Sequence, residues 1–213
     1  MKITGLDLSL RKTGAAHVRL EREVLAVTAR IIPGKALGEG HDRLDFVLRE
    51  IGQHTRHSDL VLIEGLAHSQ NTNKASELAG LHWLVRHGLW RRGIPYLVVI
   101  TQHLKIYATG QGTRVDKDDV LAAMIRRYPD VEIAGNDGAD ALALAAMGAD
   151  YMGSPLVSVP ESHRRALRMV TWPDRVREVT LDAVQKAARA VLDKRHSVTG
   201  YLVKDTRHEE KRS

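Results

Sequence analysis

The sequence predicts an α/β fold: a mixed sheet of five strands flanked by helices, with a helical appendage at its C-terminal end. Residues 3–32 read as three strands joined by turns, and two continuous apolar runs of strand length follow later. Stretches of helical periodicity separate these runs and follow them. A three-stranded antiparallel meander that leads into strand–helix–strand crossovers gives a sheet with both antiparallel and parallel pairs.

The meander is predicted from alternation and turn residues. Ile3–Leu10 alternates and is rich in apolar residues, as expected of a strand. Ala15–Leu20 and Val24–Ile32 have the same character, and the charged segment Glu21–Glu23 between them is typical of a turn.

The rest of the first 153 residues alternates between helical and strand patterns. One helix has Leu44, Val47, Leu48 and Ile51 on a single apolar face, because they recur at i, i+3, i+4 and i+7. The predicted elements are, in order, a helix over His41–His54, a strand over Asp59–Leu66, a helix over Asn71–Arg92, a strand over Pro95–Ile100, a helix over Val115–Tyr128 and a helix over Ala139–Met147.

The character of the chain changes after Gly153, where prolines interrupt the pattern. We therefore predict one domain over residues 1–153 and a helical extension over residues 154–213. Two short amphipathic helices are expected in the extension, over Glu161–Val170 and Leu181–Lys194, followed by a charged, disordered tail over Lys204–Ser213.

Composition narrows the possible functions. The chain of 213 residues has 32 Lys and Arg against 26 Asp and Glu, a formal net charge of +6, which points to a polyanionic partner such as nucleic acid. It has no cysteine, which excludes disulfides, thiolate catalysis and Cys-based zinc sites. It shows neither a signal-peptide layout nor an apolar run of membrane-spanning length, so we expect a cytoplasmic protein of a bacterium or a phage-infected host.

Four carboxylates stand where chemistry is expected. Asp7 lies on the face of its strand opposite Leu6 and Leu8, and Glu64 ends a buried strand, where ligands of open α/β sheets bind. Asp137 and Asp140 are three apart at the start of a helix, so they share one face. Each has a plain structural explanation: a surface charge for Asp7 and Glu64, and helix capping for Asp137 and, less well, for Asp140.

The combination favours a metal site. Carboxylates brought together repel one another, and a divalent cation removes that cost. A set of oxygen ligands favours Mg²⁺ or Mn²⁺, and two such ions can activate water and stabilise the leaving oxygen in phosphodiester hydrolysis. Lys105 and Lys117 are placed to neutralise charge on a phosphate beside this site, although most lysines are only solvated surface.

These motifs, in this order, resemble the RuvC family of Holliday-junction resolvases, and within it the phage-encoded branch. The resemblance covers roughly residues 1–150. It rests on the segments Ile3–Leu10 with Thr13-Gly14, Val61–Glu64, Lys105–Lys117 and Asp137–Ala143. It implies an RNase H-like fold, a homodimer with contacts from the helix Asn71–Arg92, and paired symmetric nicks in four-way DNA junctions with Mg²⁺ or Mn²⁺. By position, the resemblance implies that Asp7, Glu64, Asp137 and Asp140 are metal ligands and that Lys105 and Lys117 face the phosphate.

The chain departs from the bacterial members of that family in two places. Those members have an aromatic residue just after the second carboxylate, whereas Gly65–Gln70 contains only His68 as a candidate for stacking at a branch point. The extension has no counterpart in them. Its arginines could widen a phosphate-binding surface or form a solvated basic face: Arg164, Arg165, Arg168, Arg175 and Arg177.

Three other functions remain as alternatives. A broader nuclease acting on flaps, replication forks or RNA–DNA hybrids would use the same four carboxylates. A sugar-kinase-like or actin-like ATPase shares the Asp, Ser/Thr, Thr-Gly pattern of the first motif, but it needs a second copy of the core, which this sequence lacks. A non-catalytic DNA-binding relative predicts lost carboxylates, and all four are present.

Overall fold

The computed structural model describes residues 1–21, 24–34, 40–66 and 72–170, together with the single positions 180, 182 and 185. Several expectations fall outside these residues. They concern His68, Arg175, Arg177, the tail Lys204–Ser213 and, apart from positions 182 and 185, the helix Leu181–Lys194.

The five strands form one mixed sheet in the order β3-β2-β1-β4-β5, which confirms the predicted fold class. The strands are β1 (Lys2–Asp7), β2 (Thr13–Glu21), β3 (Val24–Ile32), β4 (Leu60–Glu64) and β5 (Tyr96–Val99). β1, β2 and β3 pair antiparallel as a meander, and β4 and β5 continue the sheet in parallel with β1. The central strand β1 therefore joins the two halves of the sheet.

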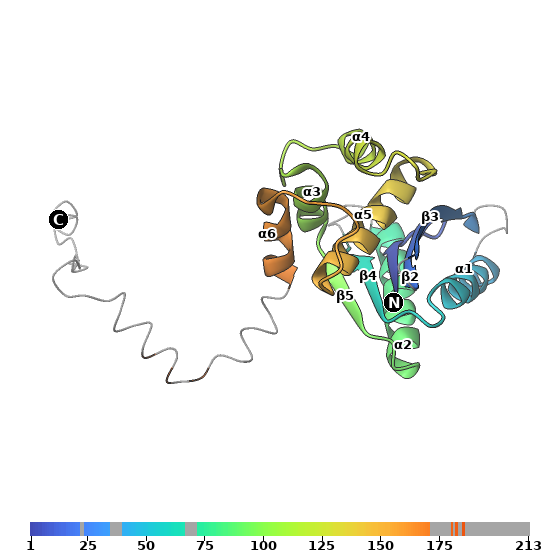
Figure 1. Cartoon of the computed structure of the whole chain (residues 1–213). Coiled ribbons are helices and arrows are strands. Elements are labelled where there is room, and N and C mark those ends of the chain that lie inside the picture. Colours follow the sequence, from blue (N-terminus) through green and yellow to red (C-terminus); the bar gives the residue numbers. More distant parts are fainter. Residues whose placement is uncertain are drawn as a thin grey trace, which may run out of the picture. The chain divides into compact units, whose positions relative to one another are not determined.

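Helices cover both faces of this sheet (Figure 1). They are α1 (His41–His54), α2 (Thr72–Arg91), α3 (Thr101–Thr109), α4 (Lys117–Arg127), α5 (Gly135–Tyr151) and α6 (Glu161–Val170). α5 lies on one face, and α1 and α2 lie on the other. α3 is absent from the elements predicted from the sequence. This helix starts after the extended residue Ile100 without a side-chain cap, so it lacks a start signal that a sequence pattern could reveal.

Alternation along the central strands divides the core into two layers. Leu6, Val61 and Ile63 point to the layer under α1 and α2, whereas Ile3 and Leu62 belong to the layer under α5. Because side chains alternate between faces, Asp7 and Glu64 share the α5 face with Ile3 and Leu62. The fold thus directs both strand-end carboxylates toward the same helix.

α5 approaches the sheet closely because two strand residues have no side chain. A Cβ atom on Gly5 would overlap the backbone at Ala141 and Ala145, and one on Gly14 would overlap the carbonyl of Asp137. These obstacles are backbone atoms of a helix that is buried over most of its length, so they have little freedom to shift. The two glycines therefore set the distance between α5 and the sheet.

We expect Gly5→Ala to lower the free energy of unfolding by about 3 kcal/mol or more, the upper end of the usual cost of overpacking. The measurement is urea unfolding followed by circular dichroism. Gly52→Ala is the matched control: Gly52 lies inside α1, where a Cβ atom would meet only Nη1 of Arg92 at 3.9 Å, so alanine should stabilise the helix by up to about 1 kcal/mol. Equal effects of the two substitutions would contradict the close-approach argument.

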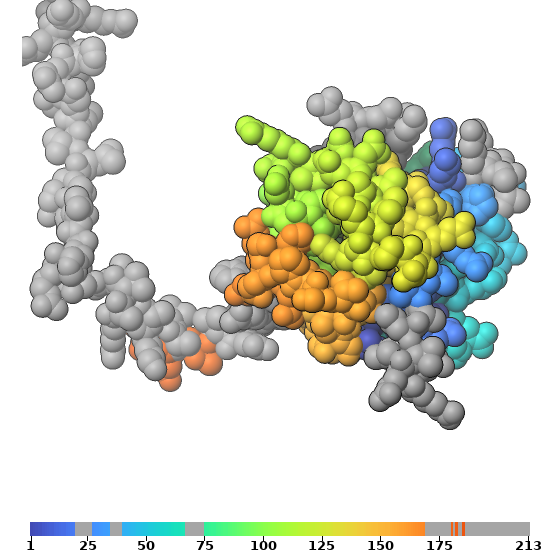
Figure 2. Space-filling model, turned by 45° about the horizontal axis from the view of Figure 1, so that its top comes forward, coloured from blue at the N-terminus to red at the C-terminus, as the bar shows by residue number. Residues whose placement is uncertain are grey.

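α6 packs on α3, and Figure 2 shows the two side by side in orange and yellow-green. Two nitrogens of Arg164 donate to the carboxylate of Asp150 at 3.1 and 2.8 Å, and this carboxylate is fully buried.

The compact unit runs from Met1 to Trp172, so it includes the helix that the sequence analysis placed in the extension. A separate role for residues 154–213 stays a prediction. Among the described helices, none is both long enough and apolar enough to cross a membrane.

Candidate metal centre

Two of the predicted carboxylates meet at the carboxyl edge of the sheet. Asp7 is the last residue of β1 and Glu64 is the last residue of β4. The two strands are parallel neighbours, and Leu6 pairs with Ile63. One residue further along each strand, the side chains of Asp7 and Glu64 come side by side on the α5 face.

Asp140 completes the group from α5. Carboxylate oxygens of Asp7, Glu64 and Asp140 all lie within 4.8 Å of one another. Asp140 is almost fully buried, in a helix whose other buried neighbours are mostly alanine and leucine. A buried carboxylate at the start of such a helix is costly unless it is paired with a cation.

Asp137 lies beside this group without joining it. Its Oδ1 accepts a hydrogen bond from Nζ of Lys117 at 3.3 Å. The helix begins at Gly135, and its N-cap residue, Ala134, has no side-chain cap. Asp137 therefore lies within the first turn rather than at the cap. The capping explanation does not account for it, although its charge still suits a helix N-terminus.

Lys117 is the cation at the centre of the cluster. Its Nζ lies 4.0 Å from Asp7, 3.7 Å from Asp140 and 3.3 Å from Asp137. As the first residue of α4, Lys117 opposes the helix dipole, which favours negative charge at this end. A reciprocal capping box between Asp116 and Asp119 fixes the helix start. The nearby carboxylates offset the unfavourable position of the lysine.

The electrostatics of the cluster favour a bound cation. Burial and the neighbouring carboxylate of Glu64 raise the pKa of Asp7. Burial is the larger cause that raises the pKa of Asp140, and the charge of Glu64 is the next; the pKa reaches about 7. Partial burial alone would lower the pKa of Lys117, but the carboxylates of Asp7, Asp140 and Asp137 together raise it. A site built only from oxygen ligands, with more negative charge than one lysine balances, fits Mg²⁺ or Mn²⁺.

These shifts predict how stability changes with pH. A carboxyl group whose pKa is raised by folding binds its proton more tightly in the folded state. The free energy of unfolding should therefore fall as pH rises from about 4 to about 7, the window set by Asp140. The measurement is the difference in melting temperature between the wild-type protein and Asp140→Asn in chelator, because histidines contribute equally to both.

We expect wild type to lose stability relative to Asp140→Asn across this window, and added Mn²⁺ to restore more stability at pH 8 than at pH 5.5. A difference that does not vary with pH would contradict the assigned cause of the shift.

Lys105 takes a different direction from Lys117. Its Nζ donates to the backbone carbonyl of Val115, so the amine holds the loop that leads into α4. The placement of Lys105 at a phosphate stays a prediction.

Sequence reasoning missed one residue of the site. The hydroxyl of Thr101 donates to Oε1 of Glu64 at 2.7 Å, and this bond orients the carboxylate toward the cluster. A signal was available: Thr101 follows β5 at the same sheet edge as Asp7 and Glu64, where polar residues after parallel strands converge.

The sequence matches no protein-family model and no curated protein. Solved structures do match. Thermus thermophilus RuvC superposes with a TM-score of 0.58 at 16% identity, covering 72% of this chain and 98% of that one. The T. thermophilus RuvC complex with a Holliday junction substrate gives 0.59 at 17% identity, covering 72% and 97%. The yeast mitochondrial Holliday junction resolvase Ydc2 gives 0.51 at 10% identity, covering 78% and 80%. The chain therefore has the RuvC-like fold of these Holliday junction resolvases.

Proposed function

We propose that this protein is a metal-dependent, structure-selective DNA endonuclease that resolves four-way junctions by paired, symmetric nicks. The observation that carries the proposal is the convergence of Asp7, Glu64 and Asp140 within 4.8 Å at the carboxyl edge of a sheet with a RuvC-like fold. Structural neighbours include a resolvase with its junction substrate, which supports branched DNA as the ligand.

The residues of the cluster divide into holding and positioning roles. Asp7, Glu64 and Asp140 would hold the metal ions, and Asp137 would complete the set from the first turn of α5. Thr101 keeps the carboxylate of Glu64 in one orientation. When bound, two Mg²⁺ or Mn²⁺ ions supply an activated water and stabilise the leaving oxygen of the phosphodiester.

Lys117 has two positions in this proposal. Without metal its amine pairs with the three aspartates, each within 4.0 Å. Its side chain is more than half exposed, so the amine can turn toward a phosphate that docks beside the cluster. Lys105 would reach the same phosphate only after releasing the carbonyl of Val115.

The paired nicks require two active sites, and α2 offers a surface for a homodimer. Trp83 and Trp90 are 64% and 70% exposed, and Leu84 is also exposed beside them. The two tryptophans are seven residues apart, so they lie on one face of the helix, while Leu81, Val85 and Leu89 fill the core from the other. This exposed aromatic surface supports the proposal that α2 forms the dimer contact.

We expect Trp90→Glu to convert a dimer into a monomer at micromolar concentration, as measured by sedimentation velocity. Ile125→Glu is the control, because this exposed side chain lies on α4. A wild-type protein that stays monomeric would remove the dimer from the proposal and leave the cleavage chemistry intact.

The function is tested by offering labelled four-way junction, flap, fork, RNA–DNA hybrid and linear duplex with Mg²⁺, Mn²⁺ or chelator. We expect symmetric nicks in the junction with either metal and none in chelator. Equal cutting of linear duplex would refute junction selectivity, and preferred cutting of flaps or hybrids would favour a broader nuclease. Cutting in chelator would refute the metal mechanism. The phage-type branch and the cytoplasmic location stay proposals that rest on the sequence alone.

A further inference from the structure

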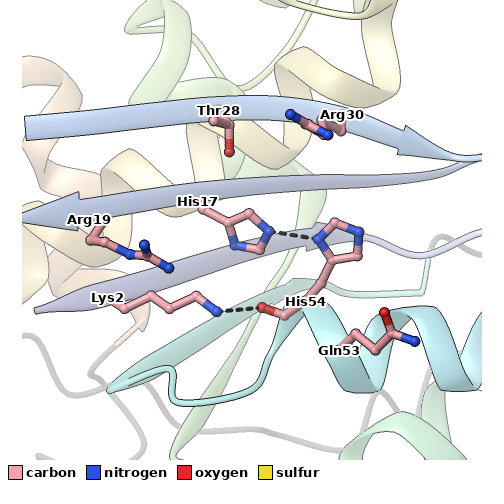
Figure 3. A pocket seen from close by; sticks show the side chains of 7 residues that line it. All are labelled: Lys2, His17, Arg19, Thr28, Arg30, Gln53 and His54. Carbon is pink, nitrogen blue, oxygen red and sulfur yellow. Dashed lines mark hydrogen bonds between the residues drawn. The ribbon is translucent and has the colours of Figure 1, made fainter.

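A polar cavity lies beside Lys2, at the start of β1 (Figure 3). Lys2 and Asp7 are five residues apart along an extended strand, a separation of roughly 17 Å. The cavity has a volume of about 380 Å³ and lies between the three strands of the meander and the end of α1. Its lining residues are Lys2, His17, Arg19, Thr28, Arg30, Gln53 and His54.

The lining is strongly cationic. Lys2, Arg19 and Arg30 contribute three positive side chains from three adjacent strands. Among the described residues that line the cavity, there is no Asp or Glu. Nζ of Lys2 donates to the backbone carbonyls of His54 and Arg56, which fix the amine without neutralising it. Two carboxylates lie near the wall without lining it: Asp59 accepts from the backbone N–H of Lys2 at 2.7 Å, and the charge of Glu50 acts on His54. The lining itself is positive, which attracts anions and repels metal cations.

A chain of hydrogen bonds leads into this cavity from the protein interior. The hydroxyls of Ser58 and Thr4 lie 2.8 Å apart, and that of Thr4 lies 3.1 Å from Nδ1 of His17. Nε2 of His17 lies 2.7 Å from Nδ1 of His54, and the two rings stack with centroids 5.0 Å apart. Burial, and after it the nearby positive groups, lower the pKa of His17 to about 3. Burial also lowers the pKa of His54, against the opposing charge of Glu50, so both rings are neutral near pH 7.

The direction of donation along these hydrogen bonds decides whether Nε2 of His54 carries a proton. Each hydroxyl has one O–H to donate and each neutral ring has one N–H. All hydrogen bonds in the chain are therefore donated in the same direction. When they point outward, His17 donates to His54, and Nε2 of His54 carries a proton at the end of the chain. An anion that accepts from that N–H would favour this direction over the reverse.

We propose that this cavity is a binding site for a phosphate group. The side chains of Lys2 and Arg30, the hydroxyl of Thr28 and the N–H of His54 are donors of the kind that bind a tetrahedral oxyanion. The phosphate could belong to a free anion or to a nucleic acid backbone, and both sources offer the same chemistry. The proposal is independent of the nuclease function, since none of these residues belongs to the carboxylate cluster.

The test is a titration of the full-length protein with inorganic phosphate and then pyrophosphate, at constant ionic strength, pH 7 and in chelator. The ring signals of His17 and His54 in ¹H–¹³C NMR spectra report the site, and those of His82, buried in α2, serve as the internal control. We expect saturable shifts at His17 and His54 alone, with pyrophosphate binding at least tenfold more tightly because it carries more charge. Unshifted signals at both rings would overturn the proposal.

Two arginine variants provide a matched comparison. Arg30→Gln should weaken phosphate binding by about tenfold or more, the usual effect of losing a hydrogen bond to a charged group. Arg49→Gln removes the same charge from the exposed face of α1, where Arg49 pairs with Asp45, and should leave binding unchanged. Equal weakening by both variants would show a response to net charge and would refute a built site.

DNA distinguishes the two sources of phosphate. If junction DNA in chelator produces the same shifts at His17 and His54, the site holds a backbone phosphate. Arg30→Gln should then reduce the number of counterions released on DNA binding by about one, as measured from the dependence of the binding constant on salt concentration. If phosphate still binds fully to the DNA complex, the ligand is a free anion. Either result supports the site and identifies its ligand.

Discussion

Replacing Asp7 with asparagine should lower the rate of junction cleavage by at least about 10³-fold while leaving junction binding nearly unchanged. Asparagine keeps the size and shape of the side chain but lacks the charge that holds a divalent cation. Loss of a metal ligand should exceed the effect of losing one hydrogen-bond donor to the transition state, which alone costs about 10²- to 10³-fold. Cleavage is measured in single-turnover assays, and binding by fluorescence anisotropy in chelator.

The same substitution should make the metal-free protein at least as stable as wild type. Asp7 has its pKa raised by burial and by Glu64, so its ionised form costs free energy in the folded state. Removing that charge removes the cost. A residue whose role is purely structural would behave in the opposite way, losing stability, binding and activity together. Asp45→Asn, an exposed carboxylate on α1, is the control that should alter neither property.

Replacing Lys117 with methionine should change cleavage and metal affinity in opposite directions. Cleavage should fall by about 10²- to 10³-fold, because a cation that stabilises charge on the phosphate is lost. Metal binding should become tighter by up to about tenfold, because the amine that occupies the cluster no longer competes with the metal. Isothermal titration with Mn²⁺ measures the affinity.

The metal-free Lys117→Met protein should also melt at a lower temperature, since Asp7, Asp137 and Asp140 lose their shared partner. Arg126→Met, at the other end of α4, removes an equal charge and is the control. Weaker Mn²⁺ binding to Lys117→Met would mean that the lysine organises the ligands, and the competition argument would then be wrong.

The sheet and the positions of the carboxylates were predictable because they follow from local patterns. Alternation in Ile3–Leu10 assigned Asp7 to the face opposite Leu6, and the end of an apolar run placed Glu64 at the edge of the sheet. The three-residue spacing put Asp140 and Asp137 on one side of a helix. These properties depend on residues close together in the chain.

The remainder depends on contacts between distant segments. Nothing near Lys117 indicates that its amine reaches three aspartates, and nothing near Lys105 indicates that it turns to Val115. The short helix α3 has no cap to announce it, so its residue Thr101 was not recognised as a partner of Glu64. The cavity around His17 likewise joins three strands and a helix end that no local pattern connects.

The close contact between α5 and the sheet also bears on how far such a protein can diverge in sequence. The distance that brings Asp140 to Asp7 and Glu64 is fixed by backbone meeting backbone at Gly5 and Gly14. Most other side chains of this layer need only be apolar and of suitable volume. A carboxylate cluster held in this way places demands on very few positions, so most of this chain could change in sequence while the architecture is kept.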